Sequence, residues 1–145
     1  MLFRSCLCVV DSNWFEIVFN NLFDNAIKYS NNEPKINIEL SNNLKKIQMK
    51  FSDNGIGLSY KDQKKIFNKF QRIENVESPS VKGTGLGLYW VDEIVKYHGG
   101  KIQVYSAGKQ KGTTFTIILP IYQSSKKRYI KTLLKISRKN KEKSD

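Results

Sequence analysis

The chain has 145 residues, of which 39% are hydrophobic, and it carries a formal net charge of +12. This length and composition suit one domain with its own hydrophobic core. No apolar run approaches the ~18 residues of a membrane-spanning helix. The run at 7–10 is shorter than the core of a signal peptide, so we expect a cytoplasmic protein.

The basic residues are concentrated in the C-terminal tail. Residues 124–145 contain nine Lys or Arg and two acidic residues. This composition is typical of a solvated chain end, and binding to nucleic acid or anionic lipid is the alternative. We therefore expect a short first segment at 1–10, a main domain at 11–121 and a basic tail at 122–145.

Hydrophobic periodicity predicts the first elements. A short strand at 7–10 precedes a helix that begins at Asp11 or Ser12 and ends near Tyr29. Apolar residues recur along this helix at spacings of three and four, as a buried face requires: Phe15, Val18, Phe19, Leu22 and Ala26. Two alternating segments, at 36–40 and 47–51, predict a pair of antiparallel strands.

The second half of the main domain continues this pattern. Ser59 and Asp62 resemble a capping box for a short helix through Phe70. A loop at 71–85, a helix at 85–98 and strands at 101–106 and 113–119 follow. This order predicts an α/β (α+β) two-layer sandwich, in which about three helices cover one face of a mixed, mainly antiparallel sheet of about five strands.

Polar side chains share one face of the first helix. Asn21, Asn25 and Lys28 stand at i, i+4 and i+7. Carboxamide oxygens are hard ligands that Mg²⁺ accepts, with waters and phosphate oxygens completing its shell. A lysine one turn further along could contact the phosphates as a point charge. The alternative is an ordinary solvated helix face.

Two glycine segments suit a nucleotide. The segment 83–88 (GTGLGL) opens a helix, where unpaired N–H groups and the positive dipole end favour an anion. It matches neither a Walker A sequence nor GxGxxG, and a purely structural turn is the alternative. Asp53 in DNGIGL (53–58) could accept a hydrogen bond from an exocyclic amine. The alternative here is a hairpin turn at Asn54-Gly55.

Five segments, in order, resemble the motifs of the catalytic, ATP-binding domain of sensor histidine kinases, a family that includes gyrase, heat-shock chaperone and mismatch-repair ATPases. The resemblance covers about residues 7–121. The segments are NLFDNAIKYS (21–30), similar to the N box; DNGIGL (53–58), similar to the first glycine box; IFNKFQRIE (66–74), similar to the F box; KGTGLGLYWV (82–91), similar to the second glycine box; and GTTFTIILP (112–120), similar to the final one.

The resemblance implies ATP and Mg²⁺ as cofactors and assigns roles to matching residues. Asn25 would bind Mg²⁺, with Asn21 beside it. At the base, Asp53 would accept a hydrogen bond from the adenine amine with Thr113 in support, Tyr29 would contact the base or ribose, and Gly55 and Gly57 would lie beside the base. Phe67 and Phe70 would anchor a mobile ATP lid formed by residues 71–84. The implied phosphate contacts are Lys28, Lys82, Gly83, Thr84, Gly85, Leu86, Gly87 and Leu88. For the two phenylalanines, ordinary core packing is the alternative.

The chain departs from the family in lacking a phosphoacceptor histidine. His98 is the sole histidine, and its place at a helix end predicts a structural, protonated residue. Residues 1–10 resemble a truncated remnant of a preceding domain. The resemblance implies donation of the ATP γ-phosphoryl group to a histidine on a separate dimerisation domain, with a response regulator downstream.

Other readings stay open. The chain could be a stand-alone protein-serine kinase of the anti-sigma-factor type, or an ATP-binding fragment without activity alone. An ATPase like the gyrase relatives is disfavoured, because those have a glutamate general base where Asn21 stands. A nucleic-acid-binding module acting through the tail is a further alternative. Membrane association would follow if the chain belongs to a longer sensor kinase.

Overall fold

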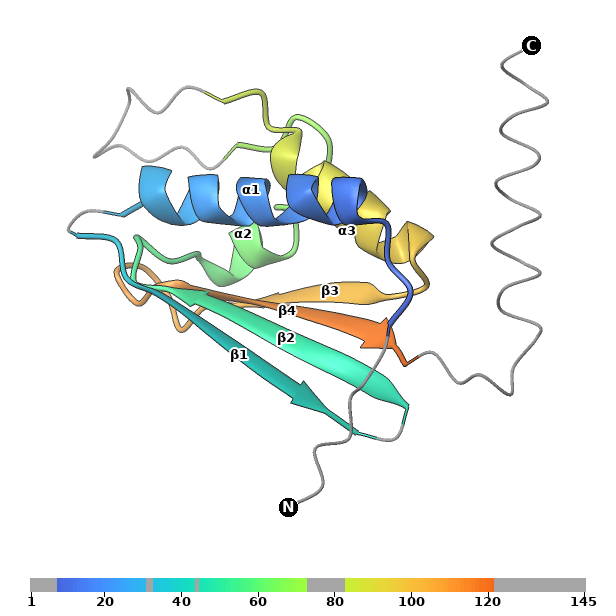
Figure 1. Cartoon of the computed structure of the whole chain (residues 1–145). Coiled ribbons are helices and arrows are strands. Elements are labelled where there is room, and N and C mark those ends of the chain that lie inside the picture. The colour runs from blue at the N-terminus through green and yellow to red at the C-terminus, as the bar shows by residue number, and fades with distance from the viewer. Residues whose placement is uncertain (1–7, 31–32, 44, 73–82, 122–145) are drawn as a thin grey trace, which may run out of the picture.

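The computed structural model describes residues 8–30, 33–43, 45–72 and 83–121. In this part of the chain, helices cover one face of an antiparallel sheet (Figure 1). The elements are α1 (Ser12–Lys28), β1 (Ile36–Asn42), β2 (Lys46–Asp53), α2 (Tyr60–Gln63), α3 (Gly87–Tyr97), β3 (Lys101–Tyr105) and β4 (Thr113–Pro120).

The sheet has the strand order β1-β2-β4-β3, and every neighbouring pair is antiparallel. The central strands match Phe51 with Phe115 and Asp53 with Thr113. The predicted two-layer sandwich is confirmed. The predicted mixed sheet of about five strands is corrected to an antiparallel sheet of four strands over the described residues.

The core lies between the helices and the sheet. On α1 the buried side chains are those that the spacing predicted, with the exception of Phe19, which is half-buried against the core. Val91, Ile94 and Val95 form the buried face of α3. The sheet contributes Phe51, Phe115, Ile117 and Leu119 among others. Removing this apolar surface from water is the main force that holds the two layers together.

Two predicted elements differ from the structure. Residues 8–10 form no strand, because Cys8 and Val10 use their apolar side chains to pack against the core rather than to pair with the sheet. The helix expected at 59–70 is four residues long. Beyond it, Lys65 N–H bonds to Asp62 O and Asn68 N–H to Lys65 O, which is the tighter i+3 pattern.

The N-terminal end of α1 is fastened to the C-terminal end of α3. His98 is buried, with 4% of its surface exposed. Its Nε2 accepts the Asp11 N–H at 3.1 Å, and its Nδ1 lies 2.7 Å from the carbonyl oxygen of Ile94. A nitrogen that accepts cannot carry a proton, so this geometry requires the neutral ring rather than the protonated one that the sequence led us to expect.

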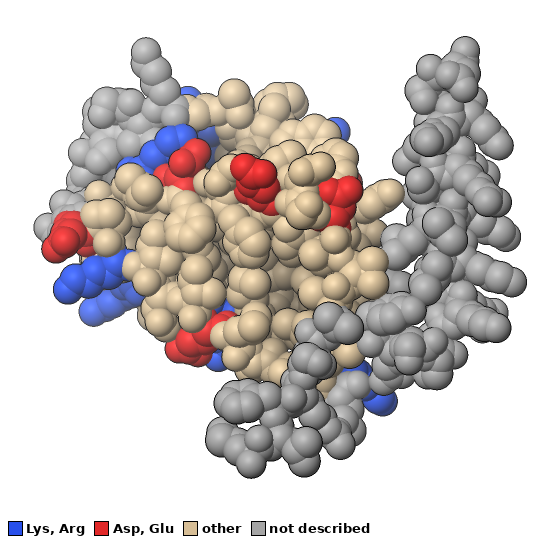
Figure 2. All heavy atoms as spheres, viewed as in Figure 1, with Lys and Arg blue, Asp and Glu red and all other residues tan. Residues whose placement is uncertain are grey.

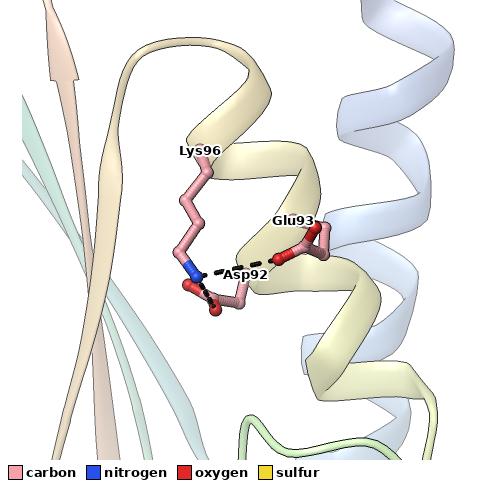
Figure 3. Close-up of polar contacts among 3 residues, drawn as sticks. All are labelled: Asp92, Glu93 and Lys96. Carbon is pink, nitrogen blue, oxygen red and sulfur yellow. Dashed lines mark hydrogen bonds and ion pairs between the residues drawn. The ribbon is translucent and has the colours of Figure 1, made fainter.

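The solvent face of α3 carries a small group of charges (Figure 3). Lys96 Nζ lies 2.6 Å from Asp92 Oδ2 and 3.7 Å from Glu93 Oε1. The hydrogen bond to Asp92 raises the pKa of Lys96. Because the Lys96 side chain is 58% exposed, water screens these ion pairs and they add little to stability. Within the described residues, no helix combines the length and the apolar character needed to cross a bilayer.

Candidate functional site: a cavity between α1, the glycine segments and the sheet

An open cavity of about 180 Å³ lies where the C-terminal half of α1, the segment after β2 and the start of α3 meet. Twelve predicted site residues line it: Asn21, Asn25, Lys28, Tyr29, Asp53, Gly57, Gly83, Thr84, Gly85, Gly87, Leu88 and Thr113. Gly55, Phe67, Phe70 and Leu86 are not among the lining residues. Lys82 lies outside the described residues. Side chains far apart in the sequence thus meet in one place.

The two asparagines of α1 have different surroundings. The Nδ2 of Asn21 donates to the carbonyl of Ile17 at 2.8 Å. Its Oδ1 lies against the start of α3, since a Cβ added to Gly87 would stand only 2.3 Å from it. Asn25, by contrast, lines the cavity and its carboxamide has no protein partner within the described residues. Of the two asparagines, Asn25 is therefore the better candidate for binding a metal ion or other ligand in the cavity.

Asp53 is held by one oxygen and presents the other. Its Oδ1 accepts the N–H of Gly55 at 2.8 Å and of Thr113 at 3.1 Å. Within the described residues, Oδ2 has no hydrogen-bond partner. Burial raises the pKa of Asp53, and the two backbone hydrogen bonds oppose that shift. The result is a fixed carboxylate with a vacant acceptor at the wall of the cavity.

The first glycine segment (53–58) packs against the end of α1 and does not form the hairpin turn that was the alternative. Ile56 N–H bonds to Tyr29 O at 2.9 Å, which ties this segment to the end of α1. Gly57 has φ +66°, and a Cβ there would stand 2.1 Å from the Gly108 carbonyl oxygen. The absence of a side chain at Gly57 is thus already required by the fold, whether or not a ligand approaches it.

Ser106 positions the first glycine segment through hydrogen bonds. This buried residue donates from Oγ to the Gly112 carbonyl at 2.7 Å and accepts the Leu58 N–H at 3.0 Å. Its backbone exchanges hydrogen bonds with the side chain of Gln63 on α2, at 2.9 and 3.1 Å. The short helix α2 and the loop after β3 therefore position the glycine segment jointly.

The glycines before α3 differ in what surrounds them. Gly85 has φ +71°, and a Cβ there would meet the backbone of Phe70, so the helix begins at Gly87 rather than at 85. A Cβ at Gly83 would meet nothing within 4 Å. The N-cap residue of α3, Leu86, makes no side-chain hydrogen bond to the helix. The first N–H groups of α3 are thus free of a side-chain cap, as an anion site needs.

The two F-box phenylalanines separate in the structure. Phe67 packs against the core and meets Phe115 edge to face at 6.5 Å. Phe70 is exposed and has φ 59°. Its backbone touches Gly85, so the two ends of the expected lid contact each other. Most of that lid, 73–82, lies outside the described residues, and its mobility stays a prediction.

Several lining residues were not among those predicted. They are Asp24, Ile56, Leu58, Ile66, Gln71, Arg72 and Phe115. Phe115 belongs to the hydrophobic core and also lines the cavity. Asp24 is adjacent in sequence to Asn25, so its carboxylate could have been predicted from the sequence as a further candidate metal ligand. Gln71 and Arg72 begin the predicted lid.

The donor set suits magnesium better than a metal that proteins enclose. The described residues contain no group of three or more His, Cys, Asp or Glu able to hold an ion. Asn25 and Asp24 bring a carboxamide and a carboxylate to the same wall. Mg²⁺ takes one or a few such oxygens and keeps waters and phosphate oxygens for the rest. The residues therefore fit Mg²⁺ held jointly with a phosphate ligand.

Comparison with known proteins gives a consistent result. Residues 10–123 match the family model described as histidine kinase-, DNA gyrase B-, and HSP90-like ATPase. The chain is 36% identical over 120 residues to the sensor protein CiaH of Streptococcus pneumoniae serotype 4, covering 83% of this chain and 27% of that protein. It is 39% identical over 106 residues to the histidine protein kinase SaeS of Staphylococcus aureus, covering 72% and 30%.

A solved structure shows the same fold. The mycobacterial sensor histidine kinase MprB superposes with a TM-score of 0.70 at 28% identity, covering 79% of this chain and 76% of that one. Against CiaH and SaeS, however, the chain spans less than a third of the relative's length. The matched region is thus one domain of longer proteins.

Proposed function

We propose, from the premise that this chain belongs to the family of histidine kinase-, DNA gyrase B- and HSP90-like ATPases, that it is the ATP-binding catalytic domain of a two-component sensor histidine kinase. It binds ATP with Mg²⁺ and donates the γ-phosphoryl group to a histidine on a separate dimerisation domain. A response regulator then receives the phosphoryl group. The observation that carries this proposal is Asp53, fixed through Oδ1 and vacant at Oδ2 in the wall of the cavity.

Asp53 suits an adenine base. A carboxylate oxygen accepts but cannot donate, and adenine presents an amine donor at the position where guanine presents a carbonyl. Thr113 contributes by holding Oδ1, so that Oδ2 keeps one direction. Tyr29, Gly55 and Gly57 surround this corner, with Gly55 in the turn that orients the carboxylate. Discrimination against GTP follows because its carbonyl would face an acceptor.

The opposite wall suits the phosphates. Lys28 and the uncapped start of α3 bring positive charge and N–H groups to the cavity. Gly83, Thr84 and Gly87 line it there. Asn25, with Asp24 or Asn21 beside it, would hold Mg²⁺. The ion would supply charge neutralisation on the phosphates, and phosphoryl transfer depends chiefly on such neutralisation and on positioning.

The acceptor belongs to another domain. His98 is buried, and both of its ring nitrogens have hydrogen-bond partners where the N-terminal end of α1 meets the C-terminal end of α3. It cannot reach a nucleotide in the cavity while the fold is intact. A histidine supplied from outside the described residues is therefore needed. We propose that the domain acts in the cytoplasm, where ATP is available.

Titration with a fluorescent ATP analogue tests the binding step. We expect Mg²⁺-dependent binding that ATP competes far better than GTP. Replacing the charged acceptor by Asp53→Asn should weaken binding about 10- to 100-fold, the equivalent of roughly 1.5–3 kcal/mol. Asp92→Asn makes the same chemical change away from the cavity and should leave affinity unchanged. Equal affinities for ATP and GTP would contradict the proposal.

Addition of a purified histidine-bearing dimerisation domain tests the transfer step. We expect labelled phosphate from ATP on that domain as acid-labile phosphohistidine, and none on His98. Asn25→Ala should abolish transfer while the fold persists. Acid-stable phosphoserine on a partner would instead support the anti-sigma-factor type of kinase. ATP binding without transfer to any histidine domain would leave an ATP-binding fragment.

A further inference from the structure

The side chain of Gln63 on α2 joins two segments that are distant in the sequence. Its Nε2 donates to the carbonyl of Ser106 at 2.9 Å and to that of Leu58 at 3.3 Å. Its Oε1 accepts the Ser106 N–H at 3.1 Å, although Ser106 lies 43 positions further along the chain. One side chain therefore makes three hydrogen bonds to the main chain of two other segments.

Only a carboxamide can make this set of bonds. Two of the three partners are carbonyls, which accept, and the third is an N–H, which donates. Glutamine carries a donor nitrogen and an acceptor oxygen on the same carbon. A glutamate at position 63 would keep the acceptor alone, and a methionine of similar length would keep neither. Each change would leave half-buried peptide groups without a partner, which is unfavourable.

Ser106 transmits this constraint toward Asp53. The Oγ of Ser106 donates to the carbonyl of Gly112 at 2.7 Å. Gly112 directly precedes Thr113, whose N–H holds Oδ1 of Asp53 at 3.1 Å. Gln63 is therefore connected, through Ser106, to one of the two N–H groups that orient the carboxylate.

The same side chain holds the cavity wall at Leu58. Leu58 lines the cavity, its N–H donates to Ser106 Oγ at 3.0 Å, and its carbonyl accepts from Gln63. Both peptide groups of Leu58 are thus bound by Gln63 and Ser106. The position of the Asp53 carboxylate relative to the wall at Leu58 consequently depends on the three bonds of Gln63.

We propose that Gln63 is a positioning residue that sets the purine selectivity of the cavity, a role that rests on the proposed binding of ATP. Gln63 is not among the residues that line the cavity, so it acts through Ser106 and Leu58. By holding these two residues it keeps Oδ2 of Asp53 where an adenine amine reaches it. Without the three bonds the carboxylate moves more freely, and a mobile acceptor discriminates less between an amine and a carbonyl.

The phosphate end of the cavity is built from other parts of the chain. Lys28 and the start of α3 border that end, and neither takes part in the bonds of Gln63. Replacing Gln63 should therefore alter recognition of the base and leave the phosphate contacts in place. A residue that merely stabilised the fold would instead weaken every nucleotide alike.

Comparison of ATP with inosine triphosphate separates these two roles, because hypoxanthine has a carbonyl where adenine has its amine and the triphosphate is the same. We expect Gln63→Met to lower the ratio of ATP affinity to inosine triphosphate affinity at least about 5-fold, as for the loss of one hydrogen bond. The affinity for inosine triphosphate itself should stay nearly unchanged. Gln103→Met is the matched control, since Gln103 is exposed on β3, and it should keep the wild-type ratio.

The outcomes distinguish this inference from the proposed function. A wild-type chain that binds both nucleotides equally would contradict the proposed function and the inference with it. A wild-type preference for ATP that Gln63→Met retains, or equal weakening of both nucleotides, would overturn the inference alone. If Gln63→Met does not fold, Gln63→Glu, which keeps the acceptor for the Ser106 N–H, decides by the same ratio, and an unchanged ratio would overturn the inference.

Salt provides a control for charge. The bonds of Gln63 join amide and peptide groups, whereas the Lys, Arg, Asp and Glu side chains that Figure 2 shows lie on the outer surface. Salt screens exposed charges and has little effect on bonds between neutral groups. The fall in the affinity ratio should therefore be the same at low and high salt. A fall that disappears at high salt would originate in surface charge and would overturn the proposal.

Amide hydrogen exchange tests the connection to Asp53 without a nucleotide. In Gln63→Glu the Thr113 N–H should exchange at least about 10-fold faster than in wild type, because its position is less restrained. The Gly100 N–H, which bonds to the Val95 carbonyl at 2.9 Å, should keep its rate. An unchanged rate at Thr113, or an equal increase at both amides, would show that Gln63 does not restrain Thr113 specifically and would overturn the proposal.

Discussion

The antiparallel helices α1 and α3 meet at two ends that are built in opposite ways. At the sealed end, the Asp11 N–H and the Ile94 carbonyl both bond to His98, and Phe15 packs on the ring at 5.1 Å. At the open end, Asn25 and the Oδ2 of Asp53 face a cavity without protein partners within the described residues. The same helix pair has satisfied polar groups at one end and vacant ones at the other.

This difference shows which polar residues hold the fold and which are kept for a ligand. Satisfied buried groups stabilise the native state, since removing one partner leaves the other unpaired. Vacant acceptors give up stability that a bound molecule later restores. Substitutions at the sealed end should therefore change stability alone, and those at the open end should change affinity more than stability.

The largest effect is expected for His98→Ala. It removes a buried ring, leaves a cavity beside Phe15 and deprives the Asp11 N–H of its acceptor. We expect a loss of about 2–4 kcal/mol in the free energy of unfolding, with unchanged ATP affinity in the fraction that stays folded. Urea unfolding measures the first and analogue titration the second.

Tyr97→Ala is the control for this end, because Tyr97 is the neighbouring residue and about half exposed. It should cost well under the His98 value. Lys96→Met, which removes the ion pairs of Figure 3, should cost no more than about 0.5 kcal/mol. If His98→Ala unfolds at the same urea concentration as Tyr97→Ala, the sealed end does not stabilise the fold as described.

The next effect is expected at the open end, for Gly87→Ala. The added Cβ would stand 2.3 Å from Asn21 Oδ1, so the Asn21 side chain must rotate away, and its bond to Ile17 is lost. Alanine favours the helix over glycine by up to about 1 kcal/mol, which offsets part of this cost. We expect stability within about 1 kcal/mol of wild type and ATP affinity reduced about 10-fold.

Gly83→Ala provides the comparison, since a Cβ there meets nothing within 4 Å. It should leave the free energy of unfolding within about 0.5 kcal/mol of wild type. A Gly87→Ala variant that binds ATP as wild type does would show that Asn21 and the start of α3 need not be in contact for binding.

Much of the fold could be predicted from local pattern. The spacing of Phe15, Val18, Leu22 and Ala26 fixed the buried face of α1, and Asp11 caps it through bonds to the Asn13 and Trp14 N–H groups. The alternation at 36–40 and 47–51 predicted the antiparallel pairing of β1 with β2, whereas the pairing of β2 with β4 was not predicted. The polar face of α1 also follows from sequence, because one helix sets the relative positions of Asn21, Asn25 and Lys28 without help from the rest of the chain.

What local pattern could not give depends on contacts between distant segments. Asp53 is oriented by Thr113, which is 60 positions away. A side chain at Gly57 would collide with Gly108, and one at Gly87 would collide with Asn21. The sequence motifs identify these glycines but do not show which of them the packing of the fold requires. The segment at 8–10 is apolar because it packs on the core, and no period distinguishes that from a strand.

The smallest effect concerns pH and the charge of Asp53. Because burial raises the pKa of Asp53 above its usual 3.8, the folded state binds this proton more tightly than the unfolded state. Stability should therefore fall as pH rises from about 3.8 through the raised pKa. Asp53→Asn keeps an oxygen for the Gly55 and Thr113 N–H groups and removes the charge, so its stability relative to wild type should increase over the same interval. Unfolding of both proteins from pH 3 to 7 measures this difference, and a difference that shrinks as pH rises would mean that the vacant carboxylate costs the open end no stability.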